Sequence, residues 1–277
     1  MIPIKTVTAI TPVRNGASLV GRTVSSIATQ RAVATGRVRL QYVLCDGASS
    51  DDTVGEAIRA AGDVELDVIS EPDRGMYDAL AKGLRRAEGD VVFYLNAGDA
   101  LVPNALDVVL DLMEQTGTKW LKGYDAHFSP EGYIVGVRLP FRFRPRLIQA
   151  SAYGRLLPMI QQESTFWRRE MLETVDLSVL ASYRLAGDNY LWRQFSTVEE
   201  LTIAKAMLGG FCFHGSHLSD NLTAYKTEMH RHSGRLNPAT FVLAAIDRVL
   251  WYAPDRIKTM ANRRHLVVYD RASGTWS

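Results

Sequence analysis

The sequence predicts an α/β fold built on a mostly parallel sheet that helices cover on both faces. Short apolar runs rich in Val and Ile recur through the first hundred residues, and segments with apolar residues at helical spacing separate them. Strands that alternate with helices form βαβ units, whose parallel strands are buried on both faces and appear as continuous apolar runs. With 277 residues, the chain is long enough to bury a sizeable core.

The first half supplies four predicted strands: VTAI (7–10), VRLQYVLCD (38–46), VELDVIS (64–70) and DVVFYLN (90–96). Apolar residues recur at helical spacing in two of the other segments: Tyr77, Leu80, Ala81 and Leu84, then Leu106, Val109, Leu110 and Met113 after Pro103.

After about residue 120 the pattern changes. Strands are predicted over 120–126 and 133–138, a helix near 186–196, and a Gly-rich segment over 209–215. Residues 238–264 are typical of one or two helices interrupted at Pro254. Without an internal repeat or a low-complexity linker, the pattern predicts one domain over 1–225 and a helical C-terminal extension over 226–277.

The composition is that of a globular protein, with 47% apolar residues, 22% charged residues and a net charge of +2. This balance argues against a disordered chain and against a nucleic-acid-binding protein. Cys45 and Cys212 each lie in an apolar run, which favours reduced, buried thiols. No apolar run reaches 18 residues and no signal peptide is recognisable, so a cytoplasmic protein is expected.

Carboxylates follow three of the predicted strands, at Asp46, Asp73 and Asp99. Ligands of such sheets bind beyond the carboxyl ends of the strands. Three carboxylates on one edge repel each other unless a cation or a polar ligand joins them. By contrast, Asp51 and Asp52 are expected in the first turn of a helix, where its dipole favours them.

Asp99 ends the stretch YLNAGD and leaves three interpretations open. It is a turn residue, half of a broken two-carboxylate metal site, or the single side-chain ligand of a site that works with one carboxylate. Asp78 and Lys82 share a helix face at i, i+4, where an exposed ion pair would contribute a few tenths of a kcal/mol.

The motifs CDGASSDDT, EPDRGMYDALAKG and YLNAGD, in this order, resemble the inverting family-2 glycosyltransferases of the GT-A fold, especially their bacterial polysaccharide and O-antigen branch. The resemblance covers about residues 6–220. It implies a Rossmann-like catalytic domain over 1–225, in which 1–100 binds a nucleotide sugar and 101–225 binds the acceptor and carries the catalytic base.

Matching positions imply a role for each residue. The metal ligand for Mg²⁺ or Mn²⁺ would be Asp99. Here the usual DxD pattern has become Asn96-Ala97-Gly98-Asp99, so the donor's diphosphate and water would complete the metal shell. The residues implied to contact the nucleotide sugar are Pro12, Arg14, Asn15, Asp46, Asp73, Arg74, Asn96, Ala97 and Gly98.

In the second half, RLAGDNYLWR is similar to the family's acidic motif before a helix, and it implies Asp188 as the base that deprotonates the acceptor hydroxyl. The alternative is a helix-capping aspartate. Contacts to the acceptor or donor sugar are assigned to Glu163, Trp167, His214 and His217. For Trp167 a core position is the alternative, and for the two histidines a metal pair.

The C-terminal region is basic, with ten Lys or Arg against five Asp or Glu over 201–277. The stripe Arg142, Arg144 and Arg146 is either a solvated edge or a contact for an acceptor diphosphate. Trp251 and Tyr252 stand near several basic residues, Arg248, Arg256, Lys258, Arg263 and Arg264. This pattern fits an interfacial helix, with packing on the catalytic domain as the alternative.

The resemblance implies an inverting, metal-dependent hexosyltransferase that uses a UDP-sugar and a polyprenyl-diphosphate-linked glycan at the inner membrane face. Peripheral membrane association and a homodimer are further expectations. A non-catalytic nucleotide-sugar-binding subunit is the alternative function. A sugar nucleotidyltransferase is disfavoured because TPVRNG stands where a GxGTR-type loop would follow the first strand.

Overall fold

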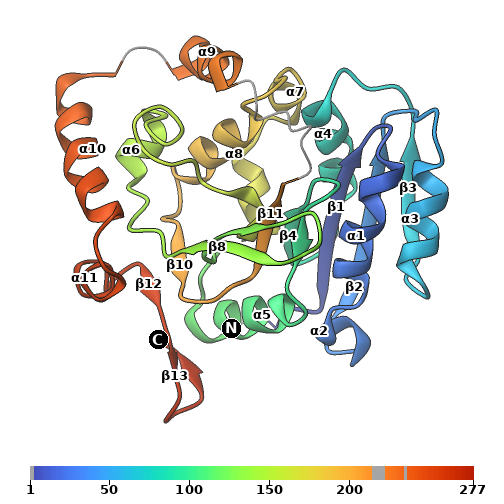
Figure 1. The fold of residues 1–277 in the computed structure, drawn as a ribbon, viewed down its shortest axis with the longest axis horizontal. Coiled ribbons are helices and arrows are strands. Elements are labelled where there is room, and N and C mark those ends of the chain that lie inside the picture. Colours follow the sequence, from blue (N-terminus) through green and yellow to red (C-terminus); the bar gives the residue numbers. More distant parts are fainter. Residues whose placement is uncertain (1–2, 214–221, 234–235) are drawn as a thin grey trace.

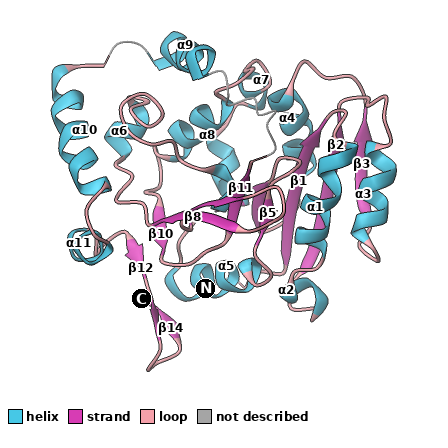
Figure 2. Ribbon diagram, viewed as in Figure 1, coloured by secondary structure: helices cyan, strands magenta, loops and turns pink. Residues whose placement is uncertain are grey.

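The computed structural model describes residues 3–213, 222–233 and 236–277. It has a central eight-stranded sheet with helices on both faces, which confirms the predicted α/β class (Figures 1 and 2). The strand order is β12-β10-β6-β9-β4-β1-β2-β3. All pairings are parallel except those of β9, which runs antiparallel to both of its neighbours.

The strands of this sheet are β1 (Thr6–Val13), β2 (Arg39–Asp46), β3 (Leu66–Ser70), β4 (Val91–Tyr94), β6 (Trp120–Lys122), β9 (Thr165–Arg168), β10 (Thr202–Ala204) and β12 (Leu266–Val267). The first strand is longer than predicted, so Pro12 lies inside β1 rather than in the following loop. Proline is tolerated there because β4 pairs with β1 only as far as Ile10, which leaves Pro12 with β2 alone.

A smaller sheet, in the order β5-β11-β7-β8, adjoins the carboxyl end of β4. Its strands are β5 (Ala100–Leu101), β11 (Gly209–Cys212), β7 (Asp125–Phe128) and β8 (Ile134–Arg138). Because β5 begins directly after Asp99 and pairs with β11, this sheet brings the Gly-rich segment onto the YLNAGD turn.

Two apolar clusters lie on the two faces of the central sheet. One contains α1 (Ala17–Ala28), α3 (Thr53–Ala61) and α5 (Ala105–Thr116), and the other contains α4 (Met76–Arg86) and α8 (Gly187–Phe195). Shorter elements complete the layers: α2 (Arg31–Ala34), α6 (Pro145–Gln149), α7 (Leu177–Leu180) and the 3₁₀ turns η1 (Gln162–Ser164) and η2 (Arg169–Thr174).

The C-terminal region contains α9 (Leu222–Ser233), α10 (Pro238–Trp251) and α11 (Asp255–Ala261), with the break at Pro254 as predicted. It also contributes β12 to the central sheet and ends in the hairpin β13 (Tyr269–Asp270) and β14 (Thr275–Trp276). The predicted boundary at residue 225 falls inside α9. Through β12 and the apolar side chains of α9 and α10, the extension shares a sheet and a core with the rest of the chain.

The basic stripe is largely structural. Arg144 makes two bonds, of 2.7 and 2.9 Å, to the fully buried Asp247 carboxylate of α10, and Arg142 lies 2.9 Å from His265 Nε2. Trp251 is buried against Phe143, so this side chain packs on the catalytic domain, which was the alternative expectation. Among the described residues, no helix has the length and apolar content needed to cross a membrane.

Candidate active site

The loops after β1 and β2 are joined by hydrogen bonds. Asn15, at φ 50°, accepts from Ser50 N with its Oδ1 at 2.8 Å, and its own N–H donates to Ser49 Oγ at 2.8 Å. The αL conformation is one that Asn adopts more readily than most residues. Arg14 beside it is exposed. The structure thus places Arg14 and Asn15 on the predicted sheet edge, next to the loop that follows Asp46.

Asp46 is 3% exposed at the end of β2 and is bound by neighbouring serines. Its carboxylate accepts from Ser49 N–H at 3.1 Å and from Ser70 Oγ at 2.6 Å, and also from the Ser49 hydroxyl. Asp73 approaches the same loop: a Cβ on Gly47 would stand 2.3 Å from Asp73 Oδ2. Glycine at 47 therefore permits the close approach of the two carboxylate loops.

Arg74 lies two residues before α4 and bonds to Asp78 at 3.0 Å. The Asp78–Lys82 pair expected from the sequence is not formed, because Lys82 bonds to Glu71 at 2.9 Å and to the Pro72 carbonyl. The guanidinium of Arg184 binds the Arg74 carbonyl, which ties this corner to the segment before α8.

The Asn96–Asp99 turn is fixed by one threonine of α1. Thr23 Oγ1 accepts from Gly98 N–H at 2.9 Å and donates to the Asp99 carbonyl at 2.7 Å. Gly98 has φ 105°, a conformation that strains residues with a side chain. This geometry explains why a glycine stands directly before Asp99.

Asp99 is 3% exposed, and its Oδ1 accepts from Cys212 N–H of β11 at 3.0 Å. Burial, and after it the charge of Glu163, raises the pKa of Asp99 well above its usual range. Burial also raises the pKa of Glu163 to about 7. These two acids therefore lie in one poorly solvated region, where the charge of Glu163 disfavours ionisation of Asp99.

The oxygen atoms near Asp99 are of the kind that could hold a hard cation. Asn96 Oδ1 and Glu163 Oε2 are buried oxygens without a hydrogen-bond partner among the described residues. Oxygen ligands suit Mg²⁺ and Mn²⁺, and a cation would relieve the repulsion between the two carboxylates. Within the described ranges no three His, Cys, Asp or Glu side chains converge as a metal cluster. The residues therefore fit a site that depends on Asp99 and on oxygens brought by a ligand.

Asp188 is the second residue of α8 and is half-buried. Its Oδ1 accepts from Asn189 N–H at 2.8 Å and from Tyr225 Oη at 2.9 Å. Burial raises the pKa of Asp188 to about 6, while Asn189 N–H and the hydroxyls of Tyr225 and Tyr77 act in the opposite direction. Such a carboxylate is ionised at neutral pH and still takes up a proton readily, as a general base requires.

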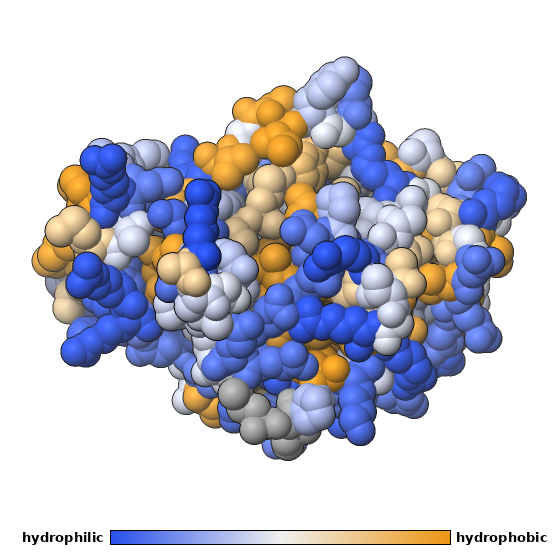
Figure 3. Space-filling model, turned by 90° about the horizontal axis from the view of Figure 1, so that it is seen from below, coloured by the Kyte–Doolittle hydropathy of each residue, from blue (hydrophilic) through white to orange (hydrophobic). Residues whose placement is uncertain are grey.

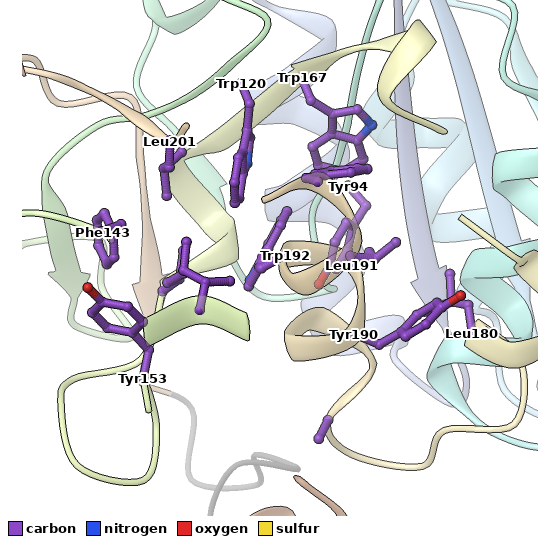
Figure 4. Packing of buried hydrophobic residues seen from close by; sticks show 14 of the residues in the cluster. Tyr94, Trp120, Phe143, Tyr153, Trp167, Leu180, Tyr190, Leu191, Trp192 and Leu201 are labelled. Atoms are coloured by element: carbon purple, nitrogen blue, oxygen red, sulfur yellow. The ribbon is translucent and has the colours of Figure 1, made fainter. Parts of the chain in front are cut away.

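Glu163 joins Asp99 and Asp188 in this region, since its charge affects the pKa of Asp99 and the Asp188 charge affects its own. Trp167 does not. It is fully buried, with its ring 5.9 Å from that of Trp192 (Figure 4), so the predicted sugar contact is corrected to a core position. His214 and His217 lie outside the described residues.

Sequence reasoning missed two tyrosines beside Asp188. Tyr77 was assigned to the apolar face of a helix, and the helical pattern contained no sign that its hydroxyl faces Asp188. Tyr225 is 37 positions from Asp188 in the chain, and no motif links the two. Only the packing of α9 against α8 brings them together.

Comparison with known proteins agrees with this geometry. The model of glycosyl transferase family 2 matches residues 8–175. An uncharacterized glycosyltransferase of Mycobacterium tuberculosis is 33% identical over 114 residues, and the match spans 41% of each chain.

Solved structures share the fold at low sequence identity. The Staphylococcus aureus TarS fragment 1–349 in complex with UDP-GlcNAc superposes with a TM-score of 0.60 at 15% identity, covering 93% of this chain and 72% of that one. The mannosyltransferase of Pyrobaculum calidifontis in complex with GDP-Man and Mn²⁺ gives 0.59 at 18% identity, covering 94% and 74%.

The α/β arrangement is thus the GT-A fold predicted from the motifs. Because the family model covers more than half of the chain, the protein belongs to glycosyl transferase family 2.

Proposed function

We propose that the protein transfers a sugar from a nucleoside diphosphate sugar, a UDP-sugar, to a hydroxyl group of a glycan acceptor, with inversion at the anomeric carbon. The environment of Asp188 carries the proposal. This carboxylate has a pKa of about 6, is oriented by neighbouring donors, and shares a buried region with Glu163 and Asp99. Perturbed acids gathered in this way are typical of catalytic sites.

In the proposed reaction, Asp188 accepts the proton of the acceptor hydroxyl while that oxygen bonds to the anomeric carbon. The bond from this carbon to the diphosphate oxygen breaks, and its electron pair leaves with the nucleoside diphosphate. A single displacement of this kind inverts the anomeric centre, because attack and departure occur on opposite faces.

A divalent cation, Mg²⁺ or Mn²⁺, would be held by Asp99 together with the donor. When bound, it would neutralise charge on the departing diphosphate. The partnerless oxygens of Asn96 and Glu163 and the raised pKa of Asp99 support a cation there. The mannosyltransferase of similar fold was solved with Mn²⁺ and GDP-Man, which agrees with this assignment.

The nucleotide would lie along the loops after β1, β2 and β3, against Arg14, Asn15, Asp46, Asp73 and Arg74. These loops are held to one another by the Asn15–Ser50 and Asp46–Ser70 hydrogen bonds before any ligand arrives. Preformed loops lose less conformational entropy on binding than loops that must first become ordered. The UDP-GlcNAc complex of TarS, which shares the fold, supports uridine as the base.

The decisive test is Asp188→Asn, which keeps the shape of the side chain but cannot take the proton. We expect turnover to fall by about 10³-fold, while the affinity for UDP, measured by calorimetry, stays within about twofold. The matched control is Asp176→Asn, because Asp176 only caps α7 and asparagine caps equally well.

Full turnover in Asp188→Asn would show that the base is misassigned. Wild-type protein that binds UDP yet turns over no donor with any lipid-linked acceptor would instead favour the non-catalytic subunit.

The acceptor side is proposed to face an anionic membrane that carries a polyprenyl-diphosphate-linked glycan, in cell-surface polysaccharide or glycolipid synthesis. α10 and α11 expose apolar side chains outward, and the exposed basic residues Arg248, Arg256, Arg263 and Arg264 lie among them. The apolar set is Phe241, Val242, Ile246, Val249, Tyr252, Ile257 and Met260. Figure 3, which views the protein from below, shows apolar patches between hydrophilic side chains on that face. A basic, apolar helical surface suits the headgroup region of anionic lipids.

Vesicle flotation tests this surface. Binding is expected to vesicles that contain phosphatidylglycerol and not to phosphatidylcholine alone, and Val249→Asp should abolish it. Ile58→Asp is the control, since Ile58 is similarly exposed but lies on α3, near the opposite edge of the sheet. Equal flotation of the wild type and Val249→Asp would refute the assignment of this surface.

A further inference from the structure

The C-terminal helix α9 lies against the proposed base. The hydroxyl of Tyr225, which is 7% exposed, bonds to both oxygens of Asp188, at 2.9 and 3.1 Å. On the other side, Gly187 allows Tyr77 to approach, because a Cβ there would stand 2.4 Å from the Tyr77 ring. The Tyr77 hydroxyl also bonds to Asp188, so two tyrosines from different helices hold one carboxylate.

A second contact fixes the position of α9. The Glu228 carboxylate accepts three backbone N–H groups from the turn that leads into α8, those of Arg184, Leu185 and Ala186, at 2.9, 2.8 and 2.7 Å. N–H groups near a helix N-terminus lack intrahelical partners, and the helix dipole attracts negative charge there. Glu228 lies one turn after Tyr225, so it attaches α9 directly beside the base.

Further contacts hold α9 in place beside Asp188. Met229 is buried, Arg155 Nη2 lies 2.7 Å from His230 Nδ1, and Arg193 donates to the His232 carbonyl at 2.9 Å. Figure 1 shows α9 above α8 and α6. The cavity between Asp188, Tyr225 and Trp192 has a volume of about 10 Å³, which holds a single water molecule at most.

We propose that α9 is part of the catalytic site: Tyr225 is a positioning residue that orients Asp188 and keeps it ionised, and Glu228 clamps α9 so that Tyr225 stays in place. This inference rests on the proposed role of Asp188 as the base. It assigns a function to residues after 221, beyond the region that the family model matches.

The physical reason is desolvation. A carboxylate removed from water tends to become protonated, and hydrogen bonds donated to its charged form oppose that tendency. The titratable groups that face Asp188 are Tyr77 of α4, Tyr94 of β4, Glu163 of η1 and Tyr225 of α9. The three tyrosines are uncharged at neutral pH, because burial keeps the pKa of each well above its usual range.

The test is the pH dependence of kcat for Tyr225→Phe. Removing the hydroxyl should move the acidic limb of the profile about half to one unit toward higher pH. It should also lower kcat at pH 7 by about tenfold, while the KM for the donor stays within about twofold. Tyr190→Phe is the matched control, because it removes a tyrosine hydroxyl from α8 that binds Asp176 rather than Asp188.

Glu228→Gln provides an independent variant that leaves Tyr225 unchanged. Its expected results are faster hydrogen exchange of the α9 amides and a smaller shift of the acidic limb in the same direction. A wild-type profile in Tyr225→Phe, or the same small loss in Tyr225→Phe and Tyr190→Phe without a pH shift, would overturn the positioning role. Unchanged exchange and profile in Glu228→Gln would overturn the clamp.

The assignment of Asp188 as the base and the role of α9 can be refuted separately. If Asp188→Asn remains active, the base assignment itself is wrong, whatever Tyr225→Phe does. If Asp188→Asn is inactive while Tyr225→Phe behaves as wild type, only the role of α9 is refuted.

Discussion

Two groups of carboxylates in this protein have opposite surroundings. The loop carboxylates, Asp46 and Asp73, accept hydrogen bonds from groups of their own and neighbouring loops, as in the 2.6 Å bond from Ser70 to Asp46. The acid trio, Asp99, Glu163 and Asp188, lies where burial raises each pKa. Glu163 Oε2 has no partner among the described side chains and backbone groups.

This difference suggests that the loop carboxylates serve ligand binding and the acid trio serves catalysis. Neutral donors satisfy the loop carboxylates, so their contribution is to shape a preformed site. The acid trio is buried, which is unfavourable for ionised carboxylates, and binding a cation, a proton or a substrate would reduce this cost. Groups whose charge state changes easily near neutral pH are those that catalysis uses.

The largest effect that tests this comparison is expected from Asp99→Asn. Turnover should fall by about 10²–10³-fold, because the site loses the charge that would hold the cation. In thermal denaturation, Mn²⁺ with UDP should raise the Tm of the wild type and not that of the variant.

The same substitution should stabilise the ligand-free protein at neutral pH, because asparagine is neutral in this buried position without taking up a proton. Asp107→Asn is the contrasting control, since Asp107 is buried but paired with Arg31, and its loss should destabilise. Equal metal stabilisation of the wild type and Asp99→Asn would contradict the cation site.

An intermediate effect is expected in the pH dependence of stability without metal. Because the folded state raises the pKa of Glu163 from 4.5 to about 7, the protonated acid is favoured in the folded protein. The resulting stability is fully present below pH 4.5 and is lost as the pH rises through 7. The free energy of unfolding should therefore fall by on the order of 3 kcal/mol across this window on account of Glu163.

Urea denaturation with a chelator, from pH 4 to pH 8, measures this loss, and Glu163→Gln should remove it. Glu170→Gln serves as the control, because Glu170 is exposed and pairs with Lys119. Identical pH slopes for the wild type and Glu163→Gln would show that Glu163 is well solvated and that burial does not raise its pKa.

The smallest effect is expected among the loop carboxylates. Ser70→Ala removes one donor from Asp46 and should cost about 1 kcal/mol of folding free energy, with a few-fold loss of UDP affinity. Ser182→Ala, at an exposed hydroxyl, should change stability by less than about 0.5 kcal/mol. A larger loss of turnover in Ser70→Ala than in Asp99→Asn would reverse the proposed division between the two groups.

The sequence by itself determined the central strands of the first half and the residues on their edge. Predicted strands 38–46 and 64–70 agree with β2 and β3 within two residues, because strands buried on both faces are apolar throughout. The helix break at Pro254 follows from the ring of proline, which cannot continue a helix. The carboxylates that follow these strands were predicted to lie together because parallel strands end on the same edge of a sheet.

Only the tertiary structure decided which side chains face the candidate active site. Trp167 is in the core because β9 inserts antiparallel between β4 and β6, a pairing that local periodicity does not specify. Tyr225 reaches Asp188, and β12 reaches β10, through contacts between distant segments. Periodicity and motif spacing report local conformation and face, whereas such contacts depend on how the elements pack, which a single sequence does not display.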